Sequence, residues 1–211
     1  MSSNQVEVWA DVVCPWCYIG KRRLELAASA SKVQPEVLHR AFQLDPTATS
    51  DGRLTTDVLA EKYGVSTEQA RAMMANVTDV ARSVGLDYNL DRTVNGNTRD
   101  AHRLALWAQE SGSAQPLLDT LYRAYFTDAR PVFTMDELVE VAGEAGFASQ
   151  EVRALLESNR FIDQVATDQR EAADLGATGV PFFVIDRRVG VAGAQPQEVF
   201  EQAFAQVNAQ G

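Results

Sequence analysis

Two cysteines, Cys14 and Cys17, are the only cysteines of this 211-residue chain, and they are separated by Pro15 and Trp16. Proline is favoured at the first position of a helix, so Pro15 predicts a helix with Cys14 at its N-terminus and Cys17 in its first turn. Residues three apart lie on one side of a helix, which brings the two sulfur atoms within reach of each other. The unpaired N–H groups and partial positive charge of a helix N-terminus favour a thiolate. We therefore predict that Cys14 is a nucleophile and Cys17 the resolving thiol of a thiol–disulfide exchange.

A CxxC pair also occurs as half of a zinc site, which needs two further ligands. The two histidines, His39 and His102, do not have the compact spacing of a zinc finger. A CxxC beside a strand–helix–strand pattern is typical of thioredoxin-like redox proteins. The sequence thus favours redox chemistry, and we expect no metal site.

The elements around the cysteines predict a parallel strand pair. Val6, Val8 and Ala10 alternate with other side chains up to Asp11, which indicates a strand. A second strand is expected over residues 36–44. The helix expected between the two strands is the crossover connection that parallel pairing requires. Asp11 is a candidate for tuning the thiols or accepting a proton from them, and a surface carboxylate at a strand end is the alternative.

The middle of the chain predicts helices only. Residues 45–52 have the composition of a linker. Ser66 with Gln69, and Thr134 with Glu137, have the spacing of a capping box. Further helices are expected over residues 55–63, after an Asn97 cap, and over residues 115–127, 149–158 and 161–175.

The end of the chain returns to strands. Residues 182–185 and 189–193 predict a hairpin, and Pro196 predicts the start of a last helix. The expected fold is therefore α/β, a thioredoxin fold interrupted by an all-helical insertion domain. We expect the thioredoxin-like domain over residues 1–50 and 160–211 and the insertion over residues 51–159.

Three segments carry a resemblance to a known family: residues 11–20 around Cys-Pro-Trp-Cys, residues 97–103, and residues 176–183 with Gly-Val-Pro. Together they resemble the DsbA-like branch of the thioredoxin superfamily, and within it the FrnE group. The resemblance implies a protein disulfide oxidoreductase in which Cys14 attacks and Cys17 resolves. The same branch includes kappa-class glutathione transferases and 2-hydroxychromene-2-carboxylate isomerases, which typically have Ser at the first cysteine position and use glutathione.

The resemblance also implies roles for residues outside the cysteine pair. The matching proline of thioredoxin-like proteins has a cis bond and faces the CxxC, so we expect a cis Val180–Pro181 bond, with the Val180 backbone free to pair with an incoming chain. Asn97 and His102 match a segment shared with glutathione-using relatives and are candidate ligand contacts. A helix cap and a hydrogen-bonded helix residue are the respective alternatives. Trp16 stands where some relatives carry a histidine, so we expect a less oxidising pair.

The composition restricts the partners. A formal charge of −10 argues against nucleic acid. The sequence has no membrane-spanning run and no signal-peptide pattern at Met1–Gln5, and both cysteines lie in one motif, so we expect a cytoplasmic protein. The expected partners are protein thiols and disulfides or small thiols. No tightly bound cofactor is expected, glutathione stays open as a redox partner or cosubstrate, and the oligomeric state is left open.

Two other functions stay open. One is a glutathione-dependent isomerase or transferase acting on a small aromatic compound. Its activity would survive Cys17→Ser but would require glutathione. The other is a redox-responsive, chaperone-like binding module, whose client protection would survive Cys14→Ser.

Overall fold

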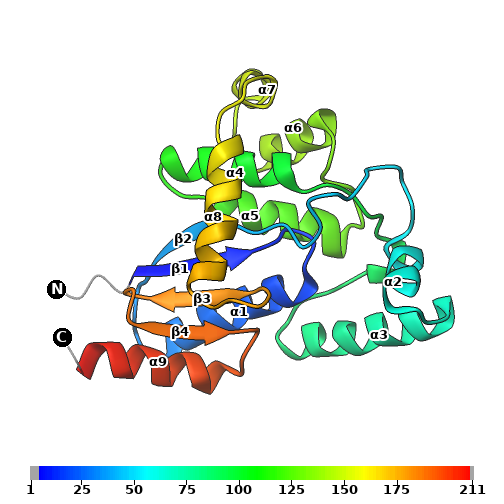
Figure 1. The fold of residues 1–211 in the computed structure, drawn as a ribbon. Helices are drawn as coiled ribbons and strands as arrows, with labels where there is room; N and C mark the ends of the chain where they lie inside the picture. The colour runs from blue at the N-terminus through cyan, green and yellow to red at the C-terminus, as the bar shows by residue number, and fades with distance from the viewer. Residues whose placement is uncertain (1–4, 210–211) are drawn as a thin grey trace.

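A four-stranded sheet organises the protein, seen in a computed structural model that describes residues 5–209 (Figure 1). Its strand order is β2-β1-β3-β4. Strand β1 (Gln5–Ala10) pairs in parallel with β2 (Glu36–Ala41) and antiparallel with β3 (Phe182–Ile185), which pairs antiparallel with β4 (Val189–Ala192). The expected strand–helix–strand start, C-terminal hairpin and α/β fold are confirmed. Residues 1–4, which entered the expectation about a signal peptide, lie outside the described residues.

Strand β2 is shorter than the predicted span of residues 36–44. Beyond Ala41 the backbone no longer pairs with β1, because β1 itself ends at Ala10. The N–H of Gln43 donates to the side chain of Gln169 at 3.3 Å, and the N–H of Leu44 donates to Asp11 Oδ2 at 2.7 Å. Side-chain acceptors thus replace the backbone pairing at the end of the strand. One of them is Asp11, which lies three residues before Cys14.

The helices lie close to their predicted positions. Helix α1 spans Pro15–Ala30. The others are α2 (Thr55–Tyr63), α3 (Thr67–Ser83), α4 (Arg99–Glu110), α5 (Gln115–Tyr122), α6 (Met135–Glu144), α7 (Ser149–Glu157), α8 (Ile162–Asp174) and α9 (Gln197–Ala209), with a 3₁₀ turn η1 (Leu90–Arg92) and a π-helical segment η2 (Arg123–Thr127). The capping boxes of Ser66 with Gln69 and of Thr134 with Glu137 are confirmed.

The predicted Asn97 cap is wrong by one position. Helix α4 begins at Arg99 with Thr98 as its N-cap, and no side chain caps it there. The Asn97 side chain instead accepts from the Arg99 N–H at 3.0 Å and donates to the carbonyl oxygens of Pro46 and Ala48. The Asn97 side chain thus ties the segment that the composition indicated as a linker to the start of α4.

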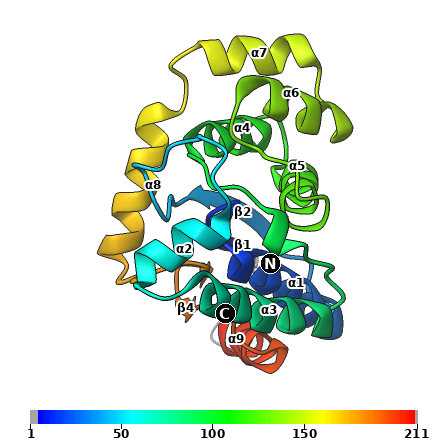
Figure 2. The same ribbon diagram turned by 90° about the vertical axis from the view of Figure 1, so that its right-hand side faces the viewer.

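Helices cover both faces of the sheet (Figures 1 and 2). On one face α1 and α9 pack together, and Phe183 of β3 meets Phe200 of α9 edge to face at 4.9 Å between ring centroids. On the other face the indole N–H of Trp9 donates to the carbonyl oxygen of Asp168 in α8 at 2.8 Å. The alternation along β1 therefore separates two buried faces.

The inserted helices reach the cysteine motif from two directions. Helix α3 packs against α1, and α4 packs against β2 and α8. In Figure 2 the pair α2 and α3 lies apart from the group α4 to α7. The domain boundaries at residues 50 and 160 stay a prediction. Within residues 5–209, no helix has both the length and the apolar character to cross a membrane.

Candidate active site

The cysteines lie at the junction of β1 and α1. Cys14 is the N-cap of α1 with an extended backbone, and Pro15 occupies the first helical turn. The N–H of Cys14 donates to the Asp11 carbonyl oxygen at 3.1 Å, and the N–H of Cys17 donates to the Cys14 carbonyl oxygen at 2.9 Å. This tight turn places Cys14 at the N-terminal end of α1, where the unpaired N–H groups and the dipole favour a negative charge.

Cys14 faces the cis proline. The Val180–Pro181 bond is cis, as predicted. The Cys14 Sγ lies 3.7 Å from the Val180 carbonyl oxygen and donates to it. The Pro181 carbonyl oxygen accepts from the Gly193 N–H of the neighbouring loop at 2.8 Å, which fixes the segment from its other side.

Gly20 allows the close approach of α1 to the cis proline. A Cβ at this position would lie 3.0 Å from Pro181 Cγ and 3.0 Å from Phe183 Cζ. Real Cβ contacts are rarely so short, so any larger residue would push the helix and the proline segment apart. The glycine is thus required by packing.

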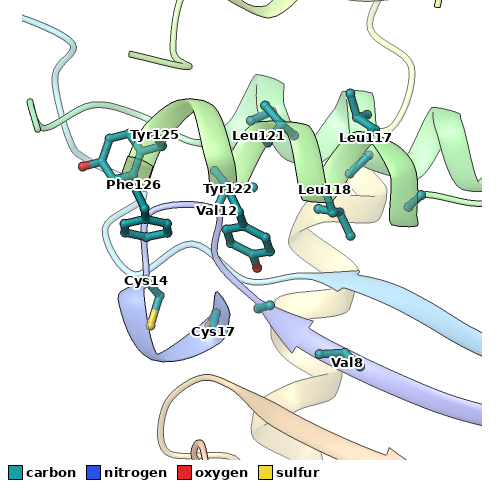
Figure 3. Packing of buried hydrophobic residues seen from close by; sticks show 14 of the residues in the cluster. Val8, Val12, Cys14, Cys17, Leu117, Leu118, Leu121, Tyr122, Tyr125 and Phe126 are labelled. Atoms are coloured by element: carbon teal, nitrogen blue, oxygen red, sulfur yellow. The ribbon is translucent and has the colours of Figure 1, made fainter. Parts of the chain in front are cut away.

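Cys17 lies one turn deeper, beneath aromatic side chains. Figure 3 shows both cysteines under Tyr122 and Phe126 of the α5–η2 segment. Cys17 is 1% exposed, and its burial raises the pKa of its thiol well above the ordinary value, with a further contribution from Cys14. Cys17 is therefore a protonated thiol at neutral pH, as a resolving cysteine must be before it reacts. Both cysteines are free thiols here.

A stack of aromatic rings joins α1 to the inserted helices. Tyr18 stacks on Tyr122 at 4.8 Å, and Tyr88 stacks on Phe126 at 4.8 Å. The Tyr88 hydroxyl donates to the Pro15 carbonyl oxygen at 2.9 Å. The π-helical turn η2 carries Phe126 into this stack, and π-turns are frequent at functional sites. No sequence pattern indicates Tyr88, because it lies in an irregular segment.

Three buried polar side chains line up beside the cysteines. Asp11 Oδ1 lies 3.2 Å from His102 Nε2, and His102 Nδ1 lies 3.2 Å from His39 Nε2. The two imidazole rings stack at 5.4 Å between centroids. Exposure is 1% for Asp11, 0% for His102 and 1% for His39, so none is a surface residue. The sequence singled out Asp11 and His102 as candidates, whereas His39 entered only as an unsuitable zinc ligand.

A cavity of about 350 Å³, here called the front cleft, opens beside Cys14. Cys14, Trp16, Asp11 and Val180 form one wall, and the inserted helices form the other with apolar residues that include Leu59, Met74, Val77 and Phe126. Trp16 is 39% exposed at the rim. The front cleft can hold an apolar segment against the Cys14 sulfur.

The site therefore gathers seven residues singled out from the sequence: Asp11, Cys14, Pro15, Trp16, Cys17, Val180 and Pro181. His102 reaches it only through Asp11. Asn97 does not take part, because its amide is held by protein groups: besides its contacts with the linker, it accepts from Gln43 Nε2 at 3.1 Å. Among residues 5–209, no group of three or more His, Cys, Asp or Glu side chains is arranged to hold a metal ion.

A strand–helix–strand start, a cis proline opposite a helix-capping cysteine and a helical insertion define a thioredoxin-type redox protein. The DSBA-like thioredoxin domain model matches residues 5–205, so the chain belongs to that family.

Similar proteins agree with this assignment. The chain is 46% identical to a probable DsbA oxidoreductase, SCO1869, from Streptomyces coelicolor, with a TM-score of 0.92 over 99% of this chain and 91% of that one. It is 25% identical to the uncharacterized protein YwbO of Bacillus subtilis (strain 168) over 95% of each chain. The cytosolic disulfide reductase DsbM of Pseudomonas aeruginosa, solved with GSH, shares the fold with a TM-score of 0.67 and 19% identity, over 97% of this chain and 99% of that one.

Proposed function

We propose that the chain catalyses thiol–disulfide exchange through its Cys-Pro-Trp-Cys motif. A Cys14 thiolate attacks one sulfur of a disulfide, forms a mixed disulfide and expels the first thiolate. Cys17 then attacks the Cys14 sulfur, closes the Cys14–Cys17 disulfide and expels the second thiolate. The reverse sequence oxidises two client thiols. The contact of Cys14 Sγ with the Val180 carbonyl oxygen beside the cis proline carries this proposal.

The lining of the front cleft suits a client whose reacting cysteine has apolar neighbours in its sequence. An extended client segment would pair with the Val180 backbone while its side chains meet Trp16 and the apolar wall of α2 and α3. Protein thiols and disulfides fit this description, and so do mixed disulfides of small thiols. Glutathione is proposed as a redox partner, supported by the GSH that accompanies DsbM. We place the reaction in the cytoplasm, because the two cysteines form one reactive pair and no separate structural disulfide.

A redox titration in glutathione buffers, followed by the fluorescence of Trp16, tests the proposal. We expect a reversible Cys14–Cys17 disulfide, with a potential between about −270 mV for a reductant and about −120 mV for a strong oxidant. Cys17→Ser should accumulate a mixed disulfide on Cys14, and Cys14→Ser should abolish exchange. A chain that forms no reversible internal disulfide at any potential contradicts the proposal. Turnover of a small aromatic substrate with glutathione in Cys17→Ser would then identify an isomerase or transferase.

A further inference from the structure

The line of Asp11, His102 and His39 connects two separate cavities. Asp11 lines the front cleft, where Cys14 lies. His39 lines a second cavity of about 420 Å³, here called the rear cavity, and Cys17 lies in its wall. The rear cavity is bounded by α1, β2 and α5, with Lys21 and Tyr122 among its lining residues. Each end of the buried line thus lies in a cavity that one of the two cysteines also lines.

One arrangement of protons satisfies all the contacts of this line. Burial, the neighbouring His102 and Arg40 together lower the pKa of His39 well below its ordinary value, so His39 is neutral. Its Nε2–H can donate to His102 Nδ1, and His102 Nε2–H can then donate to Asp11 Oδ1. This leaves Nδ1 of His39 as an acceptor on the residue that lines the rear cavity. The line is therefore a continuous donor–acceptor chain.

Two protein contacts hold the ends of the line in place. The Gln109 side chain in α4 accepts from the His39 N–H at 2.6 Å and donates to the His39 carbonyl oxygen at 3.3 Å. The Asp11 carboxylate accepts from the Leu44 N–H at 2.7 Å, so its second oxygen is oriented as well. Oriented partners keep a buried ring in one tautomer and at one angle.

The charged and titratable groups around the line define what it can exchange protons with. Cys14 and Cys17 lie beside it at the start of α1, and Arg40 follows His39 in β2. The charged side chains of Lys21, Glu25 and Asp119 line the rear cavity together with His39. Tyr122 and Tyr125 face Asp11 from the α5–η2 segment, and burial raises the pKa of both hydroxyls, which therefore stay neutral. Cys17 is then the group beside the line that must lose a proton during exchange.

The resolving step requires one proton to leave Cys17 and one proton to reach the departing client sulfur. Cys17 starts as a buried thiol, because burial raises its pKa, and it must lose its proton to attack Cys14. The thiolate that leaves Cys14 appears in the front cleft and must gain a proton. Cys17 lies beside Cys14 and Asp11 and also in the wall of the rear cavity, so its proton can leave into the cavity that His39 lines while the client sulfur takes one up in the front cleft.

We propose that His39, His102 and Asp11 relay this proton. A water molecule in the rear cavity takes the Cys17 S–H proton and gives a proton to His39 Nδ1, His39 Nε2–H passes to His102 Nδ1, and His102 Nε2–H passes to Asp11. As the S–S bond between Cys17 and Cys14 forms and the bond from Cys14 to the client sulfur breaks, Asp11 gives its proton to the leaving thiolate in the front cleft. One proton enters and one leaves, and no oxidant beyond the client disulfide is consumed. The relay rests on the proposed exchange reaction.

The test separates the two steps of the reaction of reduced protein with oxidised glutathione, followed by Trp16 fluorescence. Attack by Cys14 gives a phase whose rate rises with glutathione disulfide concentration, and resolution by Cys17 gives a phase that does not. His39→Gln retains a donor toward His102 but cannot relay a proton. We expect the resolving phase to slow by about 100-fold, the lower end of what positioned acids and bases supply. The first phase should change less than about twofold.

A pH profile distinguishes a relay from a structural role. In His39→Gln the resolving rate should rise about tenfold per pH unit below the pKa of Cys17, because its thiolate must then form by loss of a proton to solvent. The wild-type rate should be much flatter. His39→Ala with added imidazole, which fits the rear cavity, should regain part of the rate, and His102→Gln should behave as His39→Gln does if the latter fails to fold.

Asp168→Asn provides the matched control, because Asp168 is another fully buried polar residue that binds the end of β2, where it accepts from the Ala41 N–H at 2.9 Å. It should leave both phases unchanged. Unchanged resolution and pH profile in both histidine variants would overturn the relay, and so would an equal slowing of both phases without imidazole rescue. A wild-type chain with no resolving phase would instead reject the exchange reaction itself.

Discussion

The Tyr88 hydroxyl donates a hydrogen bond to the Pro15 carbonyl oxygen at 2.9 Å, and this contact links the helical insertion to the first turn of the cysteine helix. Tyr88 is 4% exposed and stacks on Phe126. Burial raises the pKa of its hydroxyl, so it remains a neutral donor throughout the physiological range. The insertion therefore fixes the turn that holds both sulfur atoms.

Tyr88→Phe should keep the ring stack and lose only this hydrogen bond. The Pro15 carbonyl oxygen would lose this side-chain donor, which should lower the free energy of unfolding by about 0.5 to 1.5 kcal/mol. Urea unfolding of the reduced protein measures the change. Tyr63→Phe, at a residue that is 55% exposed, is the control and should change stability by less than about 0.5 kcal/mol. Equal stability of Tyr88→Phe and the wild type would contradict the role of this contact.

Gly20→Ala should disturb the pairing of Cys14 with the cis proline. Alanine favours helices by about 1 kcal/mol over glycine, but the new Cβ would press on Pro181 and Phe183. We expect no gain in stability and a several-fold slower reduction of oxidised glutathione.

Gly143→Ala in α6 is the matched control for Gly20→Ala. A Cβ there meets no atom within 4 Å, so this variant should gain about 0.5 to 1 kcal/mol and keep full activity. If both variants are stabilised alike and remain fully active, the close approach of α1 to the cis proline at Gly20 is not needed for activity.

The sequence predicted the fold because its signals were local. The alternation at Val6, Val8 and Ala10, the helix-starting Pro15 and the capping box of Ser66 with Gln69 each act within a few residues, and the structure confirms the elements that they indicate. The cis bond at Pro181 was predictable only through the resemblance, because most bonds before proline are trans.

The rest of the site depends on contacts between distant segments. His39 and His102 are 63 residues apart, and Tyr88 and Pro15 are 73 apart. Nothing in the local pattern of β2 shows that His39 would meet an imidazole from α4. The error at Asn97 has a similar origin, since its side chain also bonds Gln43 and the carbonyl oxygens of Pro46 and Ala48, contacts that a local capping pattern does not predict.

Trp16→His should make the cysteine pair more oxidising. Trp16 is 39% exposed and contributes no charge, whereas a protonated imidazole beside Cys14 would stabilise the thiolate of the reduced form. We expect the potential to rise by roughly 30 mV, equivalent to about 1.4 kcal/mol for a two-electron couple. Equilibration with glutathione buffers at pH 6 and pH 8 measures it, and the increase should be larger at pH 6, where more of the imidazole is protonated. Trp16→Phe is the control, and an equal shift in both variants would show that charge is not the cause.

The stability of the reduced protein should fall in alkaline solution because of Cys17. Burial raises the pKa of this thiol in the folded state, so the unfolded chain releases its proton first. The contribution is fully present below the ordinary thiol pKa, about 8.5, and is lost progressively as pH rises from there toward the raised folded value. Urea unfolding of reduced protein from pH 7 to pH 10 should show this loss. Cys17→Ser should show a smaller loss over the same range, because Tyr88 and Tyr122, whose pKa values are raised too, contribute only near the upper end. Parallel curves for the wild type and Cys17→Ser would mean that Cys17 is not held as a buried thiol.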